Sequence, residues 1–361
     1  MRPIVSYCDK LSHIGALALV AASGQAVAMT PASPRLSPPI VIAHRGASGL
    51  RPEHTLAAYS LAIDQGADFI EPDLVPTKDD VLVARHENNI AETTNVADHP
   101  EFAARKTTKT IDGQTMTGWF VEDFTLAELK TLRARERLPT LRAGNAAYDG
   151  RFEIPTLAEI IALAKRRTQE TGRTIGIYPE TKHPTYFAHI GHPTDAPLVA
   201  ELRKAGWDSA GAPVFIQSFE VKNLQHLHGI TKVRLIQLMA GEGGPADGAV
   251  PSYAAMLTPA GLRQVATYAY GLGPDKAQLW QGTAPTSLVA DAHAAGLKVH
   301  PWTYRAENVF LPARFRRGDD PATHGDIAGE IRAAIGLGID GFFTDYPLIG
   351  VETRRAVKDH P

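Results

Sequence analysis

Short apolar runs alternate with amphipathic stretches from Ile40 to near the end of the chain. The runs have the length of buried strands, and most are followed by apolar residues at helical spacing. The expected strands are Ile40–Ala43, Ala67–Asp73, Thr174–Glu180, Val214–Ser218, Val233–Leu238, Tyr268–Gly271, Lys298–Trp302 and Gly341–Thr344. The expected helices are Thr55–Gln65, Leu157–Gln169, Pro197–Ala205, Pro259–Ala266, Ser287–Ala295 and Gly325–Leu337.

This alternation predicts an α/β fold built from parallel βαβ units. Eight such units fit a closed (β/α)8 barrel, or TIM barrel, in a single domain over residues 40–361. An open doubly wound sheet is the alternative architecture. It is disfavoured because the chain shows no glycine-rich phosphate loop of that class.

Two stretches interrupt the alternation. Val81–Arg85 follows the second expected strand after a short turn, which predicts a returning hairpin strand. Residues 88–151 are polar with few sustained apolar patterns, although Thr125–Leu132 has the pattern of a helix. We therefore expect an insertion above one end of the barrel, and little in it that could build a core.

The first 28 residues have the pattern of a secretory signal peptide. Ile14–Val20 is apolar and Ala26-Val27-Ala28 supplies small residues before a cleavage site, which we place after Ala28. Residues 29–39 are rich in proline and serine and are expected to form a linker. A buried N-terminal helix is the alternative. The leader predicts a periplasmic or secreted protein, and it contains the only cysteine, Cys8.

Composition narrows the classes of partner. The 361 residues are 44% hydrophobic and 21% charged, with a formal net charge of -2. Nucleic-acid binders usually carry a basic excess, so this balance favours a small anionic ligand. The leader's apolar run is too short for a stable membrane span, and no other segment resembles one.

Polar side chains follow several of the expected strands. His44 and Arg45 end the first strand, and Gly46 allows a sharp turn after them. Histidine exchanges protons near neutral pH, and the arginine fork suits phosphate or carboxylate. In a parallel barrel the carboxyl ends of all strands meet on one face, so we expect these groups to converge.

Three carboxylates are expected on the same face. Glu71 and Asp73 end the second strand two residues apart, so they point to the same side, and Glu180 ends the third. Converging carboxylates repel unless a cation or proton intervenes, and oxygen ligands suit Ca²⁺ or Mg²⁺. A salt-bridged surface pair is the alternative interpretation for Glu71 and Asp73.

Four more residues complete the expected site. Lys182 shares the face of Glu180 and can meet a phosphate oxygen, and His86 ends the hairpin strand as a second histidine. Two histidines on opposite sides of a phosphodiester can deprotonate the attacking oxygen and protonate the leaving one. Phe219 and Trp302 follow later strands and are expected to wall the pocket.

Together these segments resemble the glycerophosphodiester phosphodiesterase family, most closely its periplasmic bacterial branch. The resemblance runs in family order almost to the end of the chain. It lies in Ala43–Ala47, Arg51–Thr55, Glu71–Leu74, Leu82–His86, Gly176–Lys182, Gln217–Phe219, Gly271–Pro274, Val299–Thr303 and Phe342–Pro347.

The resemblance implies hydrolysis of glycerophosphodiesters to sn-glycerol 3-phosphate and an alcohol. It implies a divalent cation, Ca²⁺ or else Mg²⁺, on the three carboxylates, and His44 and His86 as the general acid/base pair. Arg45 and Lys182 would hold the phosphate. The family usually has His-Asp where this chain has His86-Glu87, so the reach of the acid differs.

The same residues also fit two other kinds of protein. A barrel phospholipase releasing cyclic phosphate from a lipid would use the same groups, and a non-catalytic periplasmic phosphodiester receptor would need no second proton-transferring histidine. The sequence leaves open the head group, the route through a cyclic phosphate or direct water attack, and the oligomeric state, a homodimer being one option.

Overall fold

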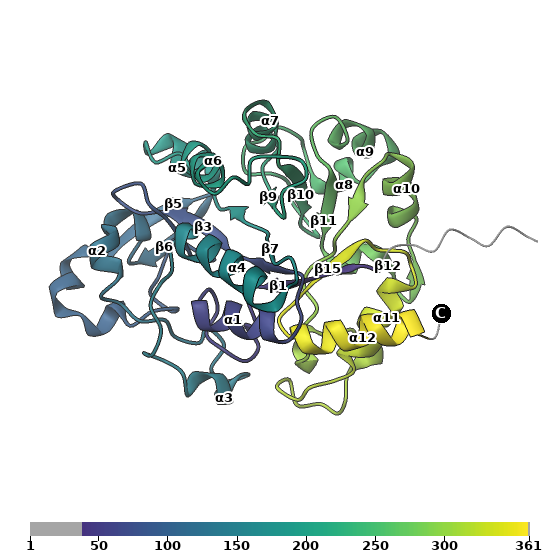
Figure 1. Ribbon diagram of the computed structural model, residues 1–361, viewed down its shortest axis with the longest axis horizontal. Helices are drawn as coiled ribbons and strands as arrows, with labels where there is room; N and C mark the ends of the chain where they lie inside the picture. Colours follow the sequence, from purple (N-terminus) through teal and green to yellow (C-terminus); the bar gives the residue numbers. More distant parts are fainter. Residues whose placement is uncertain (1–37, 360–361) are drawn as a thin grey trace, which may run out of the picture. The chain divides into compact units, whose positions relative to one another are not determined.

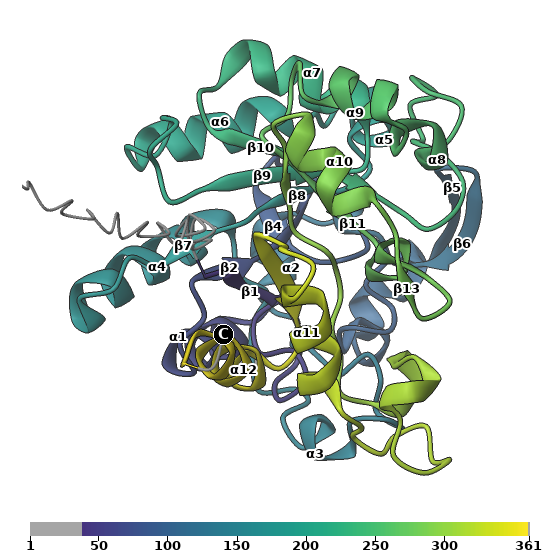
Figure 2. The same cartoon turned by 90° about the vertical axis from the view of Figure 1, so that its right-hand side faces the viewer.

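The computed structural model describes residues 38–359 (Figures 1 and 2). The expected leader, its cleavage site and nearly all of the linker lie outside these residues. The strands of the barrel are β1 Ile40–His44, β2 Phe69–Glu71 with β3 Asp73–Pro76, β7 Gly176–Ile177 with β8 Glu180–Thr181, β9 Phe215–Ser218, β10 Arg234–Met239, β11 Gly271–Pro274, β14 Lys298–Val299 and β15 Gly341–Thr344.

The strands pair in parallel around a closed ring. One run of neighbours is β15-β1-β2-β7, and the other is β14-β11-β10-β9-β8-β3. The ring closes where the N–H of Asp340 donates to the carbonyl of Val299 at 2.9 Å and that of Phe343 donates to the carbonyl of Pro301 at 3.1 Å. The predicted (β/α)8 barrel is therefore confirmed.

Helices surround the strands in both views (Figures 1 and 2). They are α1 Leu56–Asp64, α4 Leu157–Thr171, α5 Pro184–His189, α6 Asp195–Lys204, α7 Val221–Ile230, α8 Tyr253–Met256, α9 Pro259–Val265, α10 Leu288–Ala294, α11 Ile327–Ile335 and α12 Pro347–Asp359. Threonine caps start several of them: the Thr156 side chain accepts from the Glu159 N–H in a capping box that begins α4. Among the described residues, no helix combines the length and apolarity of a membrane span.

Aromatic side chains fill the barrel interior. Tyr178, Phe215 and Phe343 pack with Ile42 and Ile236, and all five are almost fully buried. A larger apolar cluster lies outside the strands, where the helices pack against them. The filled interior leaves the carboxyl ends of the strands as the place where polar side chains can gather.

The predicted hairpin strand is present as β4 Leu82–Ala84, which pairs antiparallel with β3. Residues 88–151 follow it and are called the insertion below. They contain η1 Val96–Asp98, η2 Pro100–Arg105, the hairpin of β5 Thr107–Ile111 and β6 Gln114–Gly118, η3 Val121–Asp123, α2 Leu126–Leu129 and α3 Ala143–Ala146.

The expectation that the insertion could build little core is wrong. Phe102, Trp119 and Phe124 are buried together with Val75 and Val83 of the β3–β4 hairpin. These apolar residues are far apart in the sequence and follow no helix or strand period, so no pattern reveals them. They pack because the chain folds back on the outer face of the hairpin.

Other boundaries also differ from expectation. The strand expected at Tyr268–Gly271 begins at Gly271 instead, and α7 and α12 were not expected at all. Gly271 and Gly273 have low strand propensity. Here close packing selects glycine, because a Cβ at Gly271 would lie 2.6 Å from the carbonyl oxygen of Lys298. Remaining short elements are η4 Lys276–Leu279, β12 Trp280–Gln281, β13 Ala284–Pro285, η5 Asn308–Phe310 and η6 Ala313–Phe315.

Candidate active site

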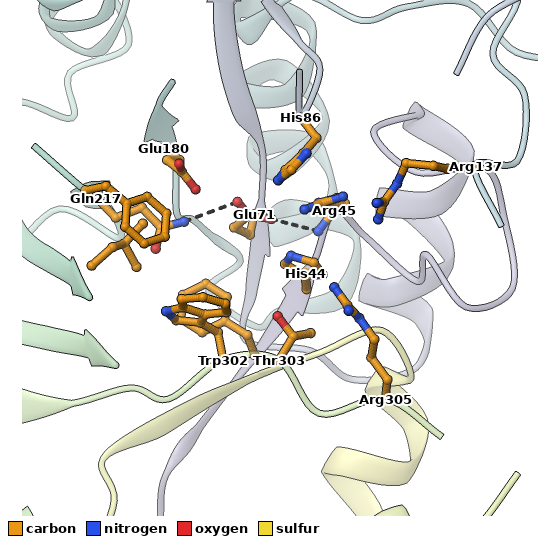
Figure 3. A pocket seen from close by; sticks show the side chains of 13 residues that line it. His44, Arg45, Glu71, His86, Arg137, Glu180, Gln217, Trp302, Thr303 and Arg305 are labelled. Atoms are coloured by element: carbon orange, nitrogen blue, oxygen red, sulfur yellow. Dashed lines mark hydrogen bonds between the residues drawn. The ribbon is translucent and has the colours of Figure 1, made fainter. Parts of the chain in front are cut away.

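A cavity of about 190 Å³ is formed where the expected polar groups converge (Figure 3). Seven of the nine residues predicted for the site line it: His44, Arg45, Glu71, His86, Glu180, Phe219 and Trp302. The other two, Asp73 and Lys182, contact residues of this lining without bordering the cavity themselves. The structure therefore brings all nine together.

The turn after β1 fixes the first two of these residues. Arg45 has φ 58° and Gly46 has φ 86°, so the chain reverses sharply at the strand end. This turn points the main-chain N–H of Arg45 at Glu71 Oε2, 2.8 Å away. The carboxylate of Glu71 is thereby held in place by the backbone of the neighbouring strand.

Gly46→Ala should destabilise the protein by more than the cost of placing a non-glycine residue in the left-handed region. The positive φ costs a non-glycine residue about 1–2 kcal/mol, and a Cβ here would also lie 2.6 Å from the carbonyl carbon of Ala58. Gly113→Ala is the matched control, since its φ is 80° with no atom within 4 Å of the added Cβ. Urea unfolding should show the larger loss for Gly46→Ala, and equal losses would contradict this explanation.

Three buried carboxylates form a compact cluster. Glu71, Asp73 and Glu180 can each bring an oxygen within 4.8 Å of the other two. Glu71 and Asp73 are 1% exposed and Glu180 is 6% exposed, so water does little to screen their repulsion. Burial and the charge of Asp73 raise the pKa of Glu71 well above its ordinary value.

The cluster fits a hard divalent cation. Its donors are all oxygens, which Ca²⁺ and Mg²⁺ prefer. Gln217 also faces the cavity, and its amide nitrogen donates to Glu71 Oε1 at 3.2 Å. The amide oxygen of Gln217 is buried and accepts no hydrogen bond among the described residues. A buried acceptor without a partner, on a side chain that contacts this cluster, is one that a bound cation could satisfy.

Glu180 should make the metal-free protein less stable as pH rises from 7 to 8. Burial, with Asp73 nearby, raises its pKa to about 8 although Lys182 opposes this, so the folded state keeps a proton that the unfolded chain has lost. The free energy of unfolding then falls by up to ~1.4 kcal/mol per pH unit. Denaturant unfolding of Glu180→Gln should show a flatter slope over this interval, and parallel slopes would contradict the assignment.

Arg45 is held by carboxylates on two sides. Its Nη1 donates to Glu53 Oε2 at 3.0 Å, and its Nε lies 3.2 Å from Asp73 Oδ2. His54 contacts the same Asp73 oxygen through Nε2 at 2.9 Å and meets the hydroxyl of Tyr59 through Nδ1. These contacts leave Arg45 rigid at the cavity wall, where a guanidinium can meet a phosphate oxygen.

His44 is oriented by Asp345. Its Nδ1 lies 2.6 Å from Asp345 Oδ1, and both side chains are nearly buried. Burial raises the pKa of Asp345, but Arg142 and Arg305 outweigh it and hold the pKa well below the ordinary value. An ionised carboxylate can only accept, so Nδ1 of His44 carries the proton and Nε2 is left for a ligand.

His86 has the same arrangement with Glu87. Its Nδ1 lies 2.9 Å from Glu87 Oε1. Burial raises the pKa of Glu87, but hydrogen bonds from His183 and His86 lower it far below its ordinary value. Glu87 is therefore an acceptor, and Nε2 of His86 is free of it. The longer acid noted in the sequence does reach the histidine.

The surroundings of both imidazoles keep them neutral near pH 7. Burial and then Arg45 lower the pKa of His44 to about 4. Burial, Arg45 and Lys182 lower that of His86 to about 3. A phosphodiester anion between them would favour protonation, because a nearby negative charge stabilises imidazolium.

The aromatic pair forms one wall of the cavity. Phe219 and Trp302 meet edge to face with ring centroids 5.7 Å apart, and Trp302 Nε1 donates to the Gly273 carbonyl. Lys182 lies 3.1 Å from Glu180 Oε1 and borders a second cavity of about 250 Å³. Glu180 and Phe219 line both cavities.

Sequence patterns assign no role to several residues of this site. Arg137 and Arg305 line the cavity from loops, and Glu53 and His54 brace Arg45 and Asp73. Loop residues follow no strand period, so only the fold brings them here. Arg51–Thr55 did carry part of the resemblance, and that was the available signal for Glu53 and His54.

A closed (β/α)8 barrel with histidines, arginines and clustered carboxylates at its strand ends defines a barrel enzyme site for a phosphate ester. Residues 44–349 match the model of the glycerophosphoryl diester phosphodiesterase family. The chain belongs to this family and is an enzyme of the phosphoric diester hydrolase class.

Relatives support this assignment, and a solved structure shares the fold. The chain is 38% identical to glycerophosphodiester phosphodiesterase GDPD6 of Arabidopsis thaliana, over 86% of this chain and 84% of that one. It is 31% identical to the glycerophosphodiester phosphodiesterase of Haemophilus influenzae, over 88% and 90%. The fold matches an Oleispira antarctica phosphodiesterase solved with sn-glycerol-3-phosphate, with TM-score 0.59, 23% identity and coverage of 87% and 96%.

Proposed function

We propose that this enzyme hydrolyses glycerophosphodiesters to sn-glycerol 3-phosphate and an alcohol, with a divalent cation and two histidines. The observation that carries the proposal is the pairing of each histidine with its own carboxylate beside one cavity. Neutral imidazoles fixed through Nδ1 present Nε2 for proton transfer. His44 and His86 are the proposed general acid/base pair.

The cation is proposed to lie on Glu71, Asp73 and Glu180, with Ca²⁺ as the expected ion. When bound it would neutralise phosphoryl charge. Arg45 would hold a phosphate oxygen, and Lys182 would add positive charge next to Glu180. Phe219 and Trp302 would contact the apolar part of the substrate. The Oleispira antarctica protein, solved with sn-glycerol-3-phosphate, supports the product.

The location of the enzyme belongs to the same proposal. The leader at residues 1–28 favours the periplasm or secretion, as in the periplasmic bacterial branch that the sequence resembles. Western blotting of periplasmic and cytosolic fractions would test this, and a chain of full length retained in the cytosol would contradict it. A homodimer is also proposed, and the molar mass from light scattering would test it.

The activity assay uses glycerophosphocholine with added Ca²⁺ and enzymatic detection of sn-glycerol 3-phosphate. Release that depends on enzyme concentration is the expected result. Phosphorus NMR of the products separates the alternatives: a stable cyclic phosphate as end product would favour the lipid-type phosphodiesterase. No turnover with several divalent ions and head groups would contradict the proposed substrate class.

A further inference from the structure

The insertion contacts the supports of both histidines. On one side Asp112, in the turn of the β5–β6 hairpin, places Oδ2 2.6 Å from His183 Nδ1. His183 Nε2 lies 3.2 Å from Glu87 Oε2, and Glu87 Oε1 lies 2.9 Å from His86 Nδ1. A continuous chain of side-chain contacts thus runs from the insertion to His86.

His183 is suited to the middle of this chain. Burial lowers its pKa, but hydrogen bonds to Asp112 and Glu87 raise it to about 9, so both ring nitrogens carry protons at neutral pH. An imidazolium can donate to two carboxylates at once. Without that donor, Oε2 of Glu87 would lose its contact with His183. The Glu87 side chain is 39% exposed, so it could then turn toward solvent. His183 therefore limits the rotamers from which Glu87 can orient His86.

On the other side the insertion contributes Arg142. Its Nη2 donates to Asp345 Oδ2 at 2.5 Å and its Nε to Glu307 Oε1 at 2.6 Å. A third donor, Nη1, reaches the carbonyl of Ser48 at 3.0 Å. The other oxygen of Asp345 holds His44. Arg142 is thus held at three points and, together with Arg305 at the same oxygen, restrains the carboxylate that orients the imidazole.

We infer that the insertion orients both histidines, with Asp112 acting through His183 and Glu87, and Arg142 acting through Asp345. These are positioning residues, since none of Asp112, His183 and Arg142 lines the cavity of about 190 Å³ that both histidines face, although Asp112 and His183 border the second cavity beside Lys182. The inference rests on the proposed acid/base roles of His44 and His86. A histidine displaced by a fraction of an ångström loses proton-transfer efficiency while substrate binding is little affected.

His183→Asn tests the first chain of contacts. Asparagine tolerates the left-handed φ of 45° at this position, so the backbone is preserved, but its side chain cannot bridge both carboxylates. His192→Asn is the matched control, because His192 also pairs with an aspartate, Asp80 at 2.6 Å, and does not line the cavity. We expect kcat to fall roughly 10- to 100-fold in His183→Asn only, with KM within about threefold.

Arg142→Lys tests the second chain, since lysine keeps the charge and loses the fork. Arg105→Lys is its control within the insertion, where Arg105 pairs with both oxygens of Glu128. The same fall in kcat is expected for Arg142→Lys alone. Should Arg142→Lys fail to fold, His183→Asn decides the inference, because His183 lies nearer the surface.

Substrates with different leaving groups distinguish the loss of histidine positioning from a general loss of structure. The histidine that protonates the leaving oxygen matters for choline, a poor leaving group, and little for p-nitrophenol, a good one. Either His183→Asn or Arg142→Lys should therefore lose more activity on glycerophosphocholine than on the glycerophosphodiester whose leaving alcohol is p-nitrophenol. Equal losses on both esters in both variants, with lowered melting temperatures, would mean a merely structural role and overturn the inference.

The proposed function can fail independently. If wild-type enzyme turns over glycerophosphocholine and His86→Ala and His44→Ala do not, the acid/base roles stand. His183→Asn and Arg142→Lys at the level of their controls would then overturn the positioning inference alone. If His86→Ala and His44→Ala both match wild type, the proposed acid/base roles fail, and if the wild type does not turn over glycerophosphocholine, the proposed function itself fails.

Discussion

His44→Ala lowers kcat for glycerophosphocholine by about 10²–10⁴-fold, the range expected for loss of one general acid/base group. The fold should survive the change. Asp345 would lose a neutral partner but keep Arg142 and Arg305, whose guanidinium groups lie against its other oxygen. No buried charge is therefore left without compensation. The measurement is sn-glycerol 3-phosphate release under saturating substrate and Ca²⁺, with circular dichroism to verify folding.

His293→Ala is the control for His44→Ala. His293 also pairs with an aspartate, Asp340 at 2.8 Å, but it is part of α10 and does not line the cavity. Its kcat should equal that of the wild type. Wild-type turnover by folded His44→Ala would refute the role of this histidine, whatever the control shows.

The barrel was predictable because apolar runs and amphipathic stretches alternate regularly along the sequence. Buried strands such as β1 and β15 are continuous apolar runs, and the helices between them carry apolar residues at helical spacing. The strand ends then predicted the site, since parallel strands in a barrel deliver Glu71, Asp73 and Glu180 to one face. Because successive side chains of a strand point to opposite faces, residues two apart could be predicted to point to the same side.

The supports of the site were not predictable by the same reasoning. His183 gave no recognisable spacing, although it contacts Glu87 and Asp112 from separate parts of the chain. Arg142 lies in a polar stretch about a hundred residues from His44. Such contacts depend on how the insertion folds, and its core forms from apolar residues with no period. Only the three-dimensional structure reveals them.

Removing the divalent cation should lower turnover by ~10³-fold or more. Metal assistance in phosphoryl transfer is worth several kcal/mol of transition-state stabilisation, and each 1.4 kcal/mol is a factor of ten. The same loss is expected for Glu71→Gln, because this change removes the charge of one of the three proposed ligands. The assay is sn-glycerol 3-phosphate release after dialysis against a chelator, followed by titration with Ca²⁺ and, separately, Mg²⁺.

The recovery of activity on adding Ca²⁺ should depend on the carboxylates Glu71, Asp73 and Glu180. Added Ca²⁺ should restore the wild type and leave Glu71→Gln inactive, whereas Asp123→Asn should behave as wild type because Asp123 pairs with Lys109 outside the cavity. Chelator-treated enzyme with full activity would contradict the metal requirement. Cation binding also removes the repulsion among three buried carboxylates, so Ca²⁺ should raise the melting temperature of the wild type more than that of Glu71→Gln. An equal rise in both would place the ion elsewhere.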